Sequence, residues 1–165
     1  ANRHPRVNIL TPGAGVGGHC IAVDPWFIID AAPEESTLVR QARMTNLRKT
    51  EWVIDKIVRA AEQMDSPVIA FFGLAYKPDV DDLRESPAVV VVLEVAKRLR
   101  RRVLVVEPHV DQLPAELADH ADLVAPDAAV ERAGMLIPLV AHRVFGQLRD
   151  DTEGKTVVDP AGVWS

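Results

Sequence analysis

The sequence is short of cysteine and of aromatic side chains, and it has no excess of positive charge. Its only cysteine is Cys20, so no intrachain disulfide can form, and this is typical of proteins of the reducing cytoplasm. No apolar run reaches the roughly 20 residues that a membrane-spanning helix needs. The net charge of -5 gives no basic field for nucleic acid. We therefore predict a cytoplasmic protein that binds neither nucleic acid nor membranes.

What the chain does contain is the balance of a folded protein, with 48% hydrophobic and 26% charged residues. Its 165 residues suffice for one domain of typical size, about 100 to 150 residues, with an appendage. Residues 1–66 carry the cysteine and a long helical pattern, whereas apolar runs and helical patterns alternate in residues 67–165. Basic side chains surround Pro5, which excludes a regular helix, so we expect residues 1–10 to form an irregular arm.

Residues 11–25 (TPGAGVGGHCIAVDP) are the best candidate for a reaction centre. A group of glycines precedes Cys20, and Asp24 follows it one helical turn later in the sequence. Glycines allow the backbone to approach a ligand closely, and a cysteine in its thiolate form is a nucleophile. The alternative is that Cys20 is a small buried hydrophobic residue, as single cysteines often are.

The same glycines resemble a dinucleotide-binding turn, but that motif needs a strand before it and a helix after it. Pro12 interrupts the possible strand at residues 7–10, and we expect no helix between the glycines and Pro25, which leaves His19 in a loop. A dinucleotide turn is therefore not predicted. The histidines lack the short spacing of zinc ligands and Cys20 has no cysteine partner, so we predict no metal site.

A helical period begins after Pro33, where two glutamates suit the positive end of a helix dipole, and it ends before Pro67. Apolar residues recur there at steps of three and four: Leu38, Ala42, Leu47, Ile54, Ile57, Val58, Ala61 and Met64. A helix over residues 34–65 would be about 45 Å long, which is too long to bury its apolar face against one small domain. A partner surface is therefore expected, and coiled-coil packing with an unrelated protein is one candidate.

Residues 67–165 are predicted to form an α/β domain with a Rossmann-like, doubly wound parallel sheet. The expected strands are residues 68–73, 103–106, 123–124, 135–140 and 156–158. The expected helices are residues 88–99, 128–133 and 144–149, the first with Ser86 as its N-cap and Pro87 at its first position. In such a sheet, ligands lie beyond the carboxyl ends of the strands.

The loop after the first strand, residues 73–86, holds Lys77 and Arg84 just ahead of a helix N-terminus. Two cations and the free N–H groups of a helix end could bind a phosphate. Alternatively, the cations pair at the surface with the loop's own carboxylates, which are Asp79, Asp81, Asp82 and Glu85. Glu107 ends the second strand, where an acid often accepts a ribose hydroxyl, although its separation from Gly73 exceeds the usual figure of about 20 residues.

Three segments carry a resemblance to a known family. Residues 12–27 (PGAGVGGHCIAVDPWF) resemble the active-site cysteine segment of the NAD-dependent UDP-sugar 6-dehydrogenases, particularly the UDP-N-acetyl-mannosamine dehydrogenase branch. Residues 73–88 (GLAYKPDVDDLRESPA) resemble the nucleotide-domain signature of the same family, and residues 157–164 are similar to its C-terminus. Family members begin with an NAD-binding domain that is absent from these residues. The resemblance therefore implies the C-terminal portion of a longer enzyme, inactive alone.

The resemblance also implies roles for individual residues. The family oxidises the primary alcohol of a UDP-sugar to a carboxylate, consuming two NAD+, and makes precursors of surface polysaccharides. Cys20 matches the nucleophile that adds to the aldehyde intermediate, and Asp24 matches the acid that helps to activate water. The expected binding residues are Lys77, Gly17 and Gly18 for the UDP-sugar, Arg6 for the substrate of a neighbouring subunit and Arg84 for NAD. The role of Asn46 is left open.

Family members dimerise through the central helix, so the resemblance implies a homodimer through residues 34–65. Two other readings of the sequence stay open: a non-catalytic module for nucleotide-sugar binding or dimerisation, and a generic flavodoxin-like scaffold whose motifs are coincidental. The identity of the sugar also stays open. We expect the cysteine segment to be mobile and Cys20 to be partly accessible.

Overall fold

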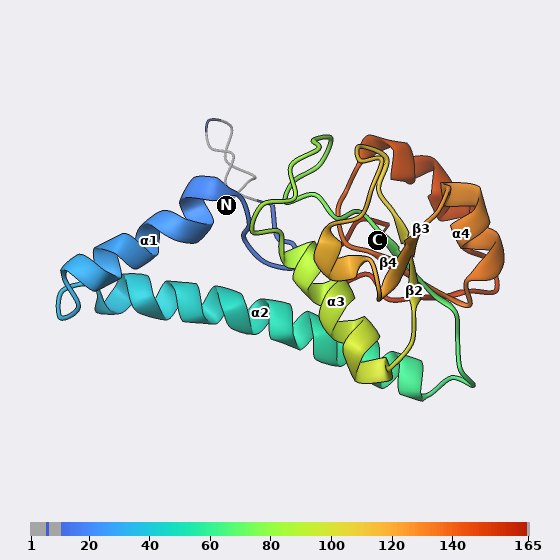
Figure 1. The fold of residues 1–165 in the computed structure, drawn as a ribbon, viewed down its shortest axis with the longest axis horizontal. Helices are drawn as coiled ribbons and strands as arrows, with labels where there is room; N and C mark the ends of the chain where they lie inside the picture. The colour runs from blue at the N-terminus through green and yellow to red at the C-terminus, as the bar shows by residue number, and fades with distance from the viewer. Residues whose placement is uncertain (1–5, 7–10, 165) are drawn as a thin grey trace.

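The computed structural model describes residue 6 and residues 11–164, which form two parts (Figure 1). A hairpin of two helices, α1 (His19–Ala31) and α2 (Thr37–Glu62), extends from one side of an α/β domain. The expected arm, residues 1–10, lies outside the described residues except for Arg6, which is exposed in a turn.

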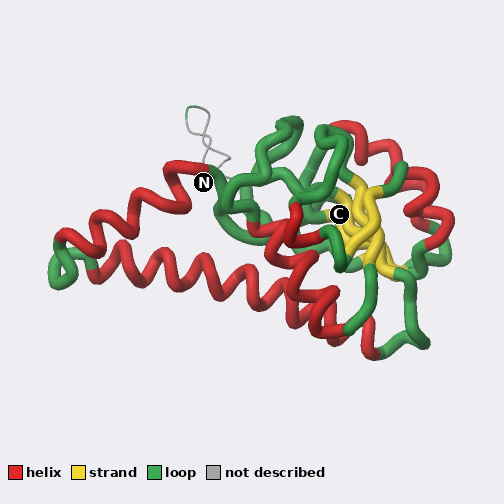
Figure 2. The backbone as a smooth tube through the Cα atoms, viewed as in Figure 1, coloured by secondary structure: helices red, strands yellow, loops and turns green. Residues whose placement is uncertain are grey.

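Five parallel strands form the sheet, in the order β3-β2-β1-β4-β5 (yellow in Figure 2). They are β1 (Ile69–Phe72), β2 (Val103–Val106), β3 (Ala121–Leu123), β4 (Met135–Pro138) and β5 (Thr156–Val157). The central strand β1 pairs with both β2 and β4, so the strand order reverses beside it. This topology confirms the predicted doubly wound sheet. The loop after β1 therefore begins at the switch point, where such folds place ligands.

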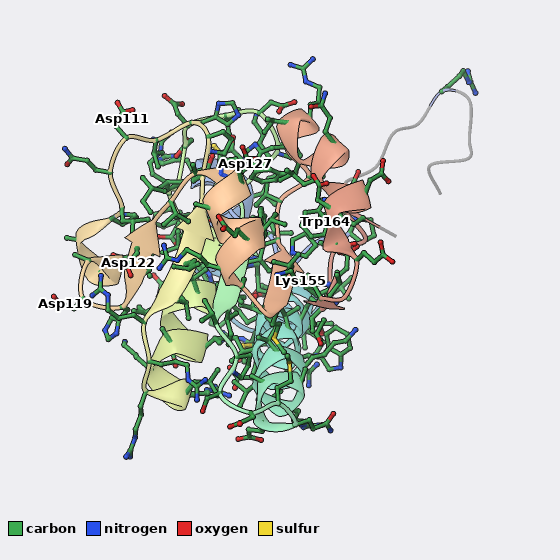
Figure 3. The ribbon with its side chains drawn as sticks, turned by 90° about the vertical axis from the view of Figure 1, so that its right-hand side faces the viewer. Asp111, Asp119, Asp122, Asp127, Lys155 and Trp164 are labelled. Atoms are coloured by element: carbon green, nitrogen blue, oxygen red, sulfur yellow. The ribbon has the colours of Figure 1, made fainter. Side chains whose placement is uncertain are left out.

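Helices cover both faces of the sheet. Successive residues of a strand point to opposite faces, so the apolar side chains of a strand such as β1 need a covering layer on each side. The remaining helices are α3 (Pro87–Leu99), η1 (Ala115–Leu117), α4 (Pro126–Arg132) and η2 (Arg143–Thr152). Phe71 of β1 packs with α3 and the second half of α2, whereas Phe72 packs with α4 and η2. The ring of Phe72 lies 5.6 Å from that of Phe145 and 5.1 Å from that of Trp164. Trp164, labelled in Figure 3, closes this layer by donating its Nε1–H to the carbonyl oxygen of Phe145.

Most predicted elements are present with small shifts at their ends. β2 has the predicted limits, and α3 begins as expected: Pro87 is its first residue and Ser86 Oγ accepts a hydrogen bond from Ala88 N. α2 is shorter than predicted, because residues 33–36 form the turn that joins it to α1. The short helix expected near residue 144 is a 3-10 helix.

The prediction that no helix opens between the glycines and Pro25 is wrong. α1 begins at His19, directly after Gly18, and continues through Pro25. Gly18 has a φ of 84°, which glycine adopts without steric strain because it has no side chain. This conformation turns the chain into the helix. Pro25 removes one backbone hydrogen bond, but Ala22 and Ile29 are buried on a helix that contacts α2 along the hairpin. Tertiary packing therefore overrides the local signal.

The two halves of α2 lie in different environments. Val53, Ile54, Ile57 and Ala61 in the second half belong to the hydrophobic core. The first half and α1 project beyond the α/β domain (Figure 1) and expose large apolar side chains, which are Ile21, Phe27, Ile28, Leu38, Met44 and Leu47. Among the described residues, no helix is both long and apolar enough to cross a membrane.

Side chains of α2 hold the glycine segment, residues 11–18, against the domain. Asn46 Oδ1 accepts a hydrogen bond from Val16 N at 3.0 Å, and Thr50 Oγ1 donates one to the carbonyl oxygen of Ala14 at 2.9 Å. The side chain of Thr50 is buried, so its hydroxyl needs such a partner. Asn46 therefore anchors the segment that leads to the cysteine.

Two glycines of this segment have contrasting surroundings. A Cβ atom on Gly17 would lie 2.6 Å from the carbonyl oxygen of Glu85 and 2.9 Å from Cδ of Pro87. A Cβ atom on Gly13 would meet no heavy atom within 4 Å. Gly17 is therefore required for close packing, and Gly13 is not.

We expect Gly17→Ala to lower the free energy of unfolding by about 1–3 kcal/mol, because the added methyl group overlaps backbone and proline atoms that have little freedom to move. Urea denaturation followed by circular dichroism measures this change. Gly13→Ala is the matched control, expected to leave stability unchanged or to raise it by about 0.4–1 kcal/mol through the unfolded state. Equal effects of the two substitutions would contradict the packing argument.

Candidate active site

The fold brings together the two segments that the sequence singled out. Gly18 N donates a hydrogen bond to the carbonyl oxygen of Arg84 at 3.1 Å. A Cβ atom would lie 2.8 Å from Tyr76 Cβ if placed on Gly17, and 2.9 Å from the Tyr76 ring if placed on Gly18. The backbone before Cys20 thus lies directly against the loop of residues 73–86.

Cys20 is the second residue of α1 and is exposed, which excludes the alternative of a buried hydrophobic cysteine. Its Sγ lies 3.8 Å from Nδ1 of His19, within reach of a weak hydrogen bond. Asp24 is exposed one turn further along, and a separation of four residues places it on the same face of the helix. The first turn of a helix also has unpaired backbone N–H groups and the positive end of the helix dipole. A thiol, a base and a carboxylate are therefore gathered at one helix end.

Lys77 is exposed in the loop that follows β1. Its Nζ lies 5.4 Å from the centroid of the neighbouring Tyr76 ring, against which the glycine segment packs. In the part of the chain that the structure describes, no carboxylate forms an ion pair with Lys77. Its charge is therefore available to an anionic ligand.

Arg84 differs from Lys77, because a carboxylate of its own loop already binds it. Arg84 Nε and Nη2 donate to the Asp82 carboxylate at 2.7–3.2 Å, and Arg84 N donates to Asp82 Oδ1 at 3.0 Å. These side-chain and backbone hydrogen bonds lower the pKa of Asp82 to about 2. Asp79 pairs outside the loop, with Arg143 Nε at 2.8 Å. Surface pairing, the alternative to phosphate binding, therefore applies to Arg84 and not to Lys77.

The N-terminus of α3 is less open to an anion than one of the two alternatives, phosphate binding, assumed. Ser86 Oγ already accepts the N–H of Ala88, and Pro87 has no N–H to offer. The side chain of Pro87 is also covered, since Cβ atoms on Gly15 and Gly17 would lie 3.0 Å or less from it. The glycine segment and the N-cap residue therefore engage or cover part of this helix end.

Glu107 has a different role from the ribose contact that we expected. It is only 4% exposed, and its Oε2 accepts hydrogen bonds from Leu74 N at 2.7 Å and Ala75 N at 3.0 Å. Its Oε1 accepts one from His109 N at 3.1 Å, and Oε2 lies 3.1 Å from Nε2 of His142. Burial alone would raise the pKa of the Glu107 carboxyl, but the hydrogen bonds from His142 and the backbone outweigh it, so the pKa lies below its usual value. Glu107 therefore fixes the loop.

No pattern in the sequence pointed to His142, which the fold places beside Glu107. Asp79, His109 and His142 have potential ligand atoms within 4.8 Å of one another, a grouping that their distant sequence positions concealed. However, His142 Nδ1 accepts a hydrogen bond from Asp79 N at 2.9 Å, and its Nε2 faces Glu107. Both ring nitrogens are thus already engaged within the protein, and this arrangement favours a structural hydrogen-bond network over a metal site.

Comparisons with known proteins match both parts of the chain. Residues 70–165 match the UDP binding domain of the UDP-glucose/GDP-mannose dehydrogenase family, and residues 1–48 match its central domain. The NDP-N-acetyl-D-galactosaminuronic acid dehydrogenase of Ralstonia nicotianae is 51% identical over 100% of this chain and 39% of its own length. The UDP-N-acetyl-D-mannosamine dehydrogenase of Yersinia pestis is 47% identical over 99% of this chain and 41% of its own. The chain thus spans about two fifths of these relatives.

Solved structures agree with these matches. The UDP-N-acetyl-mannosamine dehydrogenase of Staphylococcus aureus superposes with a TM-score of 0.70 and 34% identity, over 99% of this chain and 37% of that one. The GDP-mannose dehydrogenase of Pseudomonas aeruginosa has a TM-score of 0.76 over 98% of this chain and 40% of that one, and at 20% identity it supports the fold alone. From the family match over more than half of its length and these relatives, the chain belongs to the UDP-glucose/GDP-mannose dehydrogenase family.

Proposed function

We propose that this chain carries the substrate-binding and thiol-bearing part of an NAD-dependent UDP-sugar 6-dehydrogenase. The reaction would oxidise the primary alcohol of UDP-N-acetyl-mannosamine, or of a related UDP-sugar, to the carboxylate of a surface polysaccharide precursor. One observation carries the proposal: Gly17 and Gly18 pack on Tyr76, and so bring the thiol-bearing end of α1 against the loop that holds Lys77. We assign the described sheet to the UDP-sugar, so residues 1–165 alone are expected to bind nucleotide without turnover.

Cys20 would supply the nucleophile for the second half of the reaction. His19 Nδ1, 3.8 Å from Sγ, could accept the thiol proton. The thiolate would then add to the carbonyl carbon of the sugar aldehyde, and oxidation of that adduct would leave a thioester on Cys20. Water would cleave the thioester, releasing the carboxylate and restoring the thiol. Asp24, exposed one turn along the helix, would take a proton from that water.

Arg84 is the residue of this chain that we assign to NAD. Its side chain is 68% exposed, and its carbonyl oxygen accepts the N–H of Gly18, two residues before Cys20, so an anionic group beside the thiol would lie near it. A cofactor phosphate would compete with Asp82, which holds the guanidinium in the structure. NAD+ would supply the hydride acceptor for both oxidations.

We assign Lys77 to the contact with the diphosphate of the UDP-sugar. Gly17 and Gly18 would let the UDP-sugar approach the backbone closely. Lys77 has no carboxylate partner among the described residues, and it lies in the loop that follows the carboxyl end of the central strand. Arg6 is exposed, as a contact with the substrate of a neighbouring subunit requires. The relatives are named for different amino sugars, whereas residues 70–165 match a UDP binding domain, so we name UDP as the nucleotide and leave the hexosamine open.

We further propose that the chain forms a homodimer through the helical hairpin. The exposed apolar side chains gather on α1 and on the projecting half of α2, where Leu38 is 81% and Phe27 is 69% exposed. A concentration of exposed apolar side chains of this kind is typical of an interaction site. A second copy offers the same face, and isologous pairing of one patch with itself is the commonest arrangement in homodimers.

We expect Lys77→Ala to weaken the binding of UDP about 10- to 100-fold, because it removes a charge-assisted contact to the diphosphate. Isothermal titration calorimetry of this chain with UDP, and then with UDP-N-acetyl-mannosamine, measures the change. Lys97→Ala removes the same charge from the far end of α3 and should leave the affinity unchanged. Equal affinities for the wild type and Lys77→Ala would refute this assignment.

We expect the thiol of Cys20 to react with iodoacetamide in the folded protein at a rate within about tenfold of the denatured rate, because the side chain is exposed. Mass spectrometry follows the labelling, and Cys20→Ser, which removes the only thiol, gives the blank. Saturating UDP-N-acetyl-mannosamine should slow the reaction, since the sugar would cover the thiol. Labelling that stays unchanged by the ligand would argue against Cys20 facing the substrate.

We expect Leu47→Glu to convert the dimer into a monomer at micromolar concentration, because a charge would be buried at the centre of the proposed interface. Light scattering coupled to gel filtration measures the mass. Val144→Glu is the matched control: Val144 is 48% exposed, close to the 45% of Leu47, but lies on η2. A wild-type protein of monomeric mass would overturn the proposed dimer.

A further inference from the structure

His142 lies on the turn after β4, buried to 98%, and none of the roles above uses it. Its ring accepts one hydrogen bond and donates another. Nδ1 lies 2.9 Å from Asp79 N, and because a backbone N–H can only donate, Nδ1 must be an unprotonated acceptor. The ring proton then resides on Nε2, which donates to Glu107 Oε2 at 3.1 Å. The two partners select one tautomer and one orientation of the ring.

These bonds complete a clamp on the loop that holds Lys77. Glu107 fixes the start of the loop through Leu74 N and Ala75 N, and His142 fixes it again at Asp79. Only residues 76–78 lie between the two anchors. Lys77 is the middle one, so its backbone position follows from both anchors.

The second anchor also supports an unfavourable backbone conformation. Asp79 has a φ of 58°, in the left-handed region that residues with a side chain seldom adopt. Its N–H is bound by the ring of His142, and its Oδ1 accepts a hydrogen bond from Arg143 N at 3.1 Å. Two neighbouring residues thus bind the two ends of Asp79 and hold the turn that follows Lys77.

We propose that His142 is a positioning residue for nucleotide binding: its Nδ1 holds the Asp79 turn and thereby sets the direction in which Lys77 meets the diphosphate. The proposal rests on the proposed function, in which Lys77 contacts UDP. It assigns His142 no contact with the ligand. His142 supplies a hydrogen-bond acceptor, Nδ1, in a fixed position. The hydrogen bond from Nε2 to Glu107 prevents the ring from rotating.

If the ring of His142 served only for packing, its requirements would differ from those of a positioning residue. The ring of His142 lies 5.2 Å from that of Phe145 and 4.9 Å from that of His109. Packing alone depends on size, whereas positioning depends on an acceptor at the δ position. Asparagine places an amide oxygen at the δ position, where it can accept the Asp79 N–H. Glutamine places its amide at the ε position, where it can donate to Glu107 but leaves Asp79 without its acceptor.

The experiment compares UDP affinity by calorimetry for the wild type, His142→Asn and His142→Gln, each with and without Lys77→Ala. We expect His142→Gln to weaken UDP binding about tenfold and His142→Asn to change it by less than about threefold. In the Lys77→Ala background, His142→Gln should have almost no further effect, because the side chain that it positions is gone. Equal losses for the two His142 variants, or fully additive losses with Lys77→Ala, would overturn the proposal.

A ligand-free readout separates this inference from the proposed function. Amide hydrogen exchange of Asp79, followed by NMR, should accelerate at least tenfold in His142→Gln and stay near the wild-type rate in His142→Asn. If Lys77→Ala leaves UDP affinity unchanged while Asp79 exchange responds in this way, the function assigned to Lys77 fails and the clamp stands. Unchanged exchange of Asp79 in folded His142→Gln would refute the clamp itself.

Discussion

The carboxylate of Glu107 is buried beneath the switch point of the sheet, and a buried charge is stable only where donors surround it. The penalty for an unpaired buried carboxylate is several kcal/mol. Here the donors are three backbone N–H groups and the ring of His142. They come from the segments that follow β1, β2 and β4, so a single charge ties three strand ends together. The start of the loop of residues 73–86 is thereby held in place.

The position of the thiol depends on that loop. Once the loop is fixed, Tyr76 and the carbonyl oxygen of Glu85 form a surface that only a backbone without side chains can approach. Gly17 and Gly18 meet this requirement, and the positive φ of Gly18 turns the chain directly into α1. The glycines of the cysteine segment therefore act in packing between two parts of the protein. Of the two arguments against a dinucleotide turn, the missing helix is contradicted by α1, and the possible strand at residues 7–10 lies outside the described residues.

Much of the α/β domain could be predicted because its signals are local. Short apolar runs bounded by polar residues indicated the strands, and Ser86 followed by Pro87 indicated the start of α3. The helix α1 was missed because Pro25 is a local signal against a helix, whereas the burial of Ala22 and Ile29 that stabilises it depends on α2. Local rules do not include such packing.

The site was predictable only in its residue types. The sequence identified Lys77 and Arg84 as the cations of the loop, but which of them has a carboxylate partner depends on side-chain geometry. Asp82 binds Arg84, and Lys77 keeps no such partner among the described residues. The pairing of Glu107 with His142 joins residues 35 positions apart, and no periodic pattern reports it. The position of Glu107 at the end of a strand therefore suggested a contact with a ligand. Its burial gives it a structural role instead.

The helix α1 links the two proposals about this chain, because its ends serve different surfaces. Cys20 and Asp24 lie at its start, against the α/β domain, whereas Phe27 and Ile28 lie near its end on the exposed apolar face. Only Ala22 and Ile29 of this helix are buried within one copy, which is little apolar area to fix a helix that contains a proline. A second copy that covered Phe27 and Ile28 would add the missing contacts. Dimerisation would then hold the thiol in place as well as joining two subunits, and the geometry around Cys20 would depend on an interface that Cys20 does not touch.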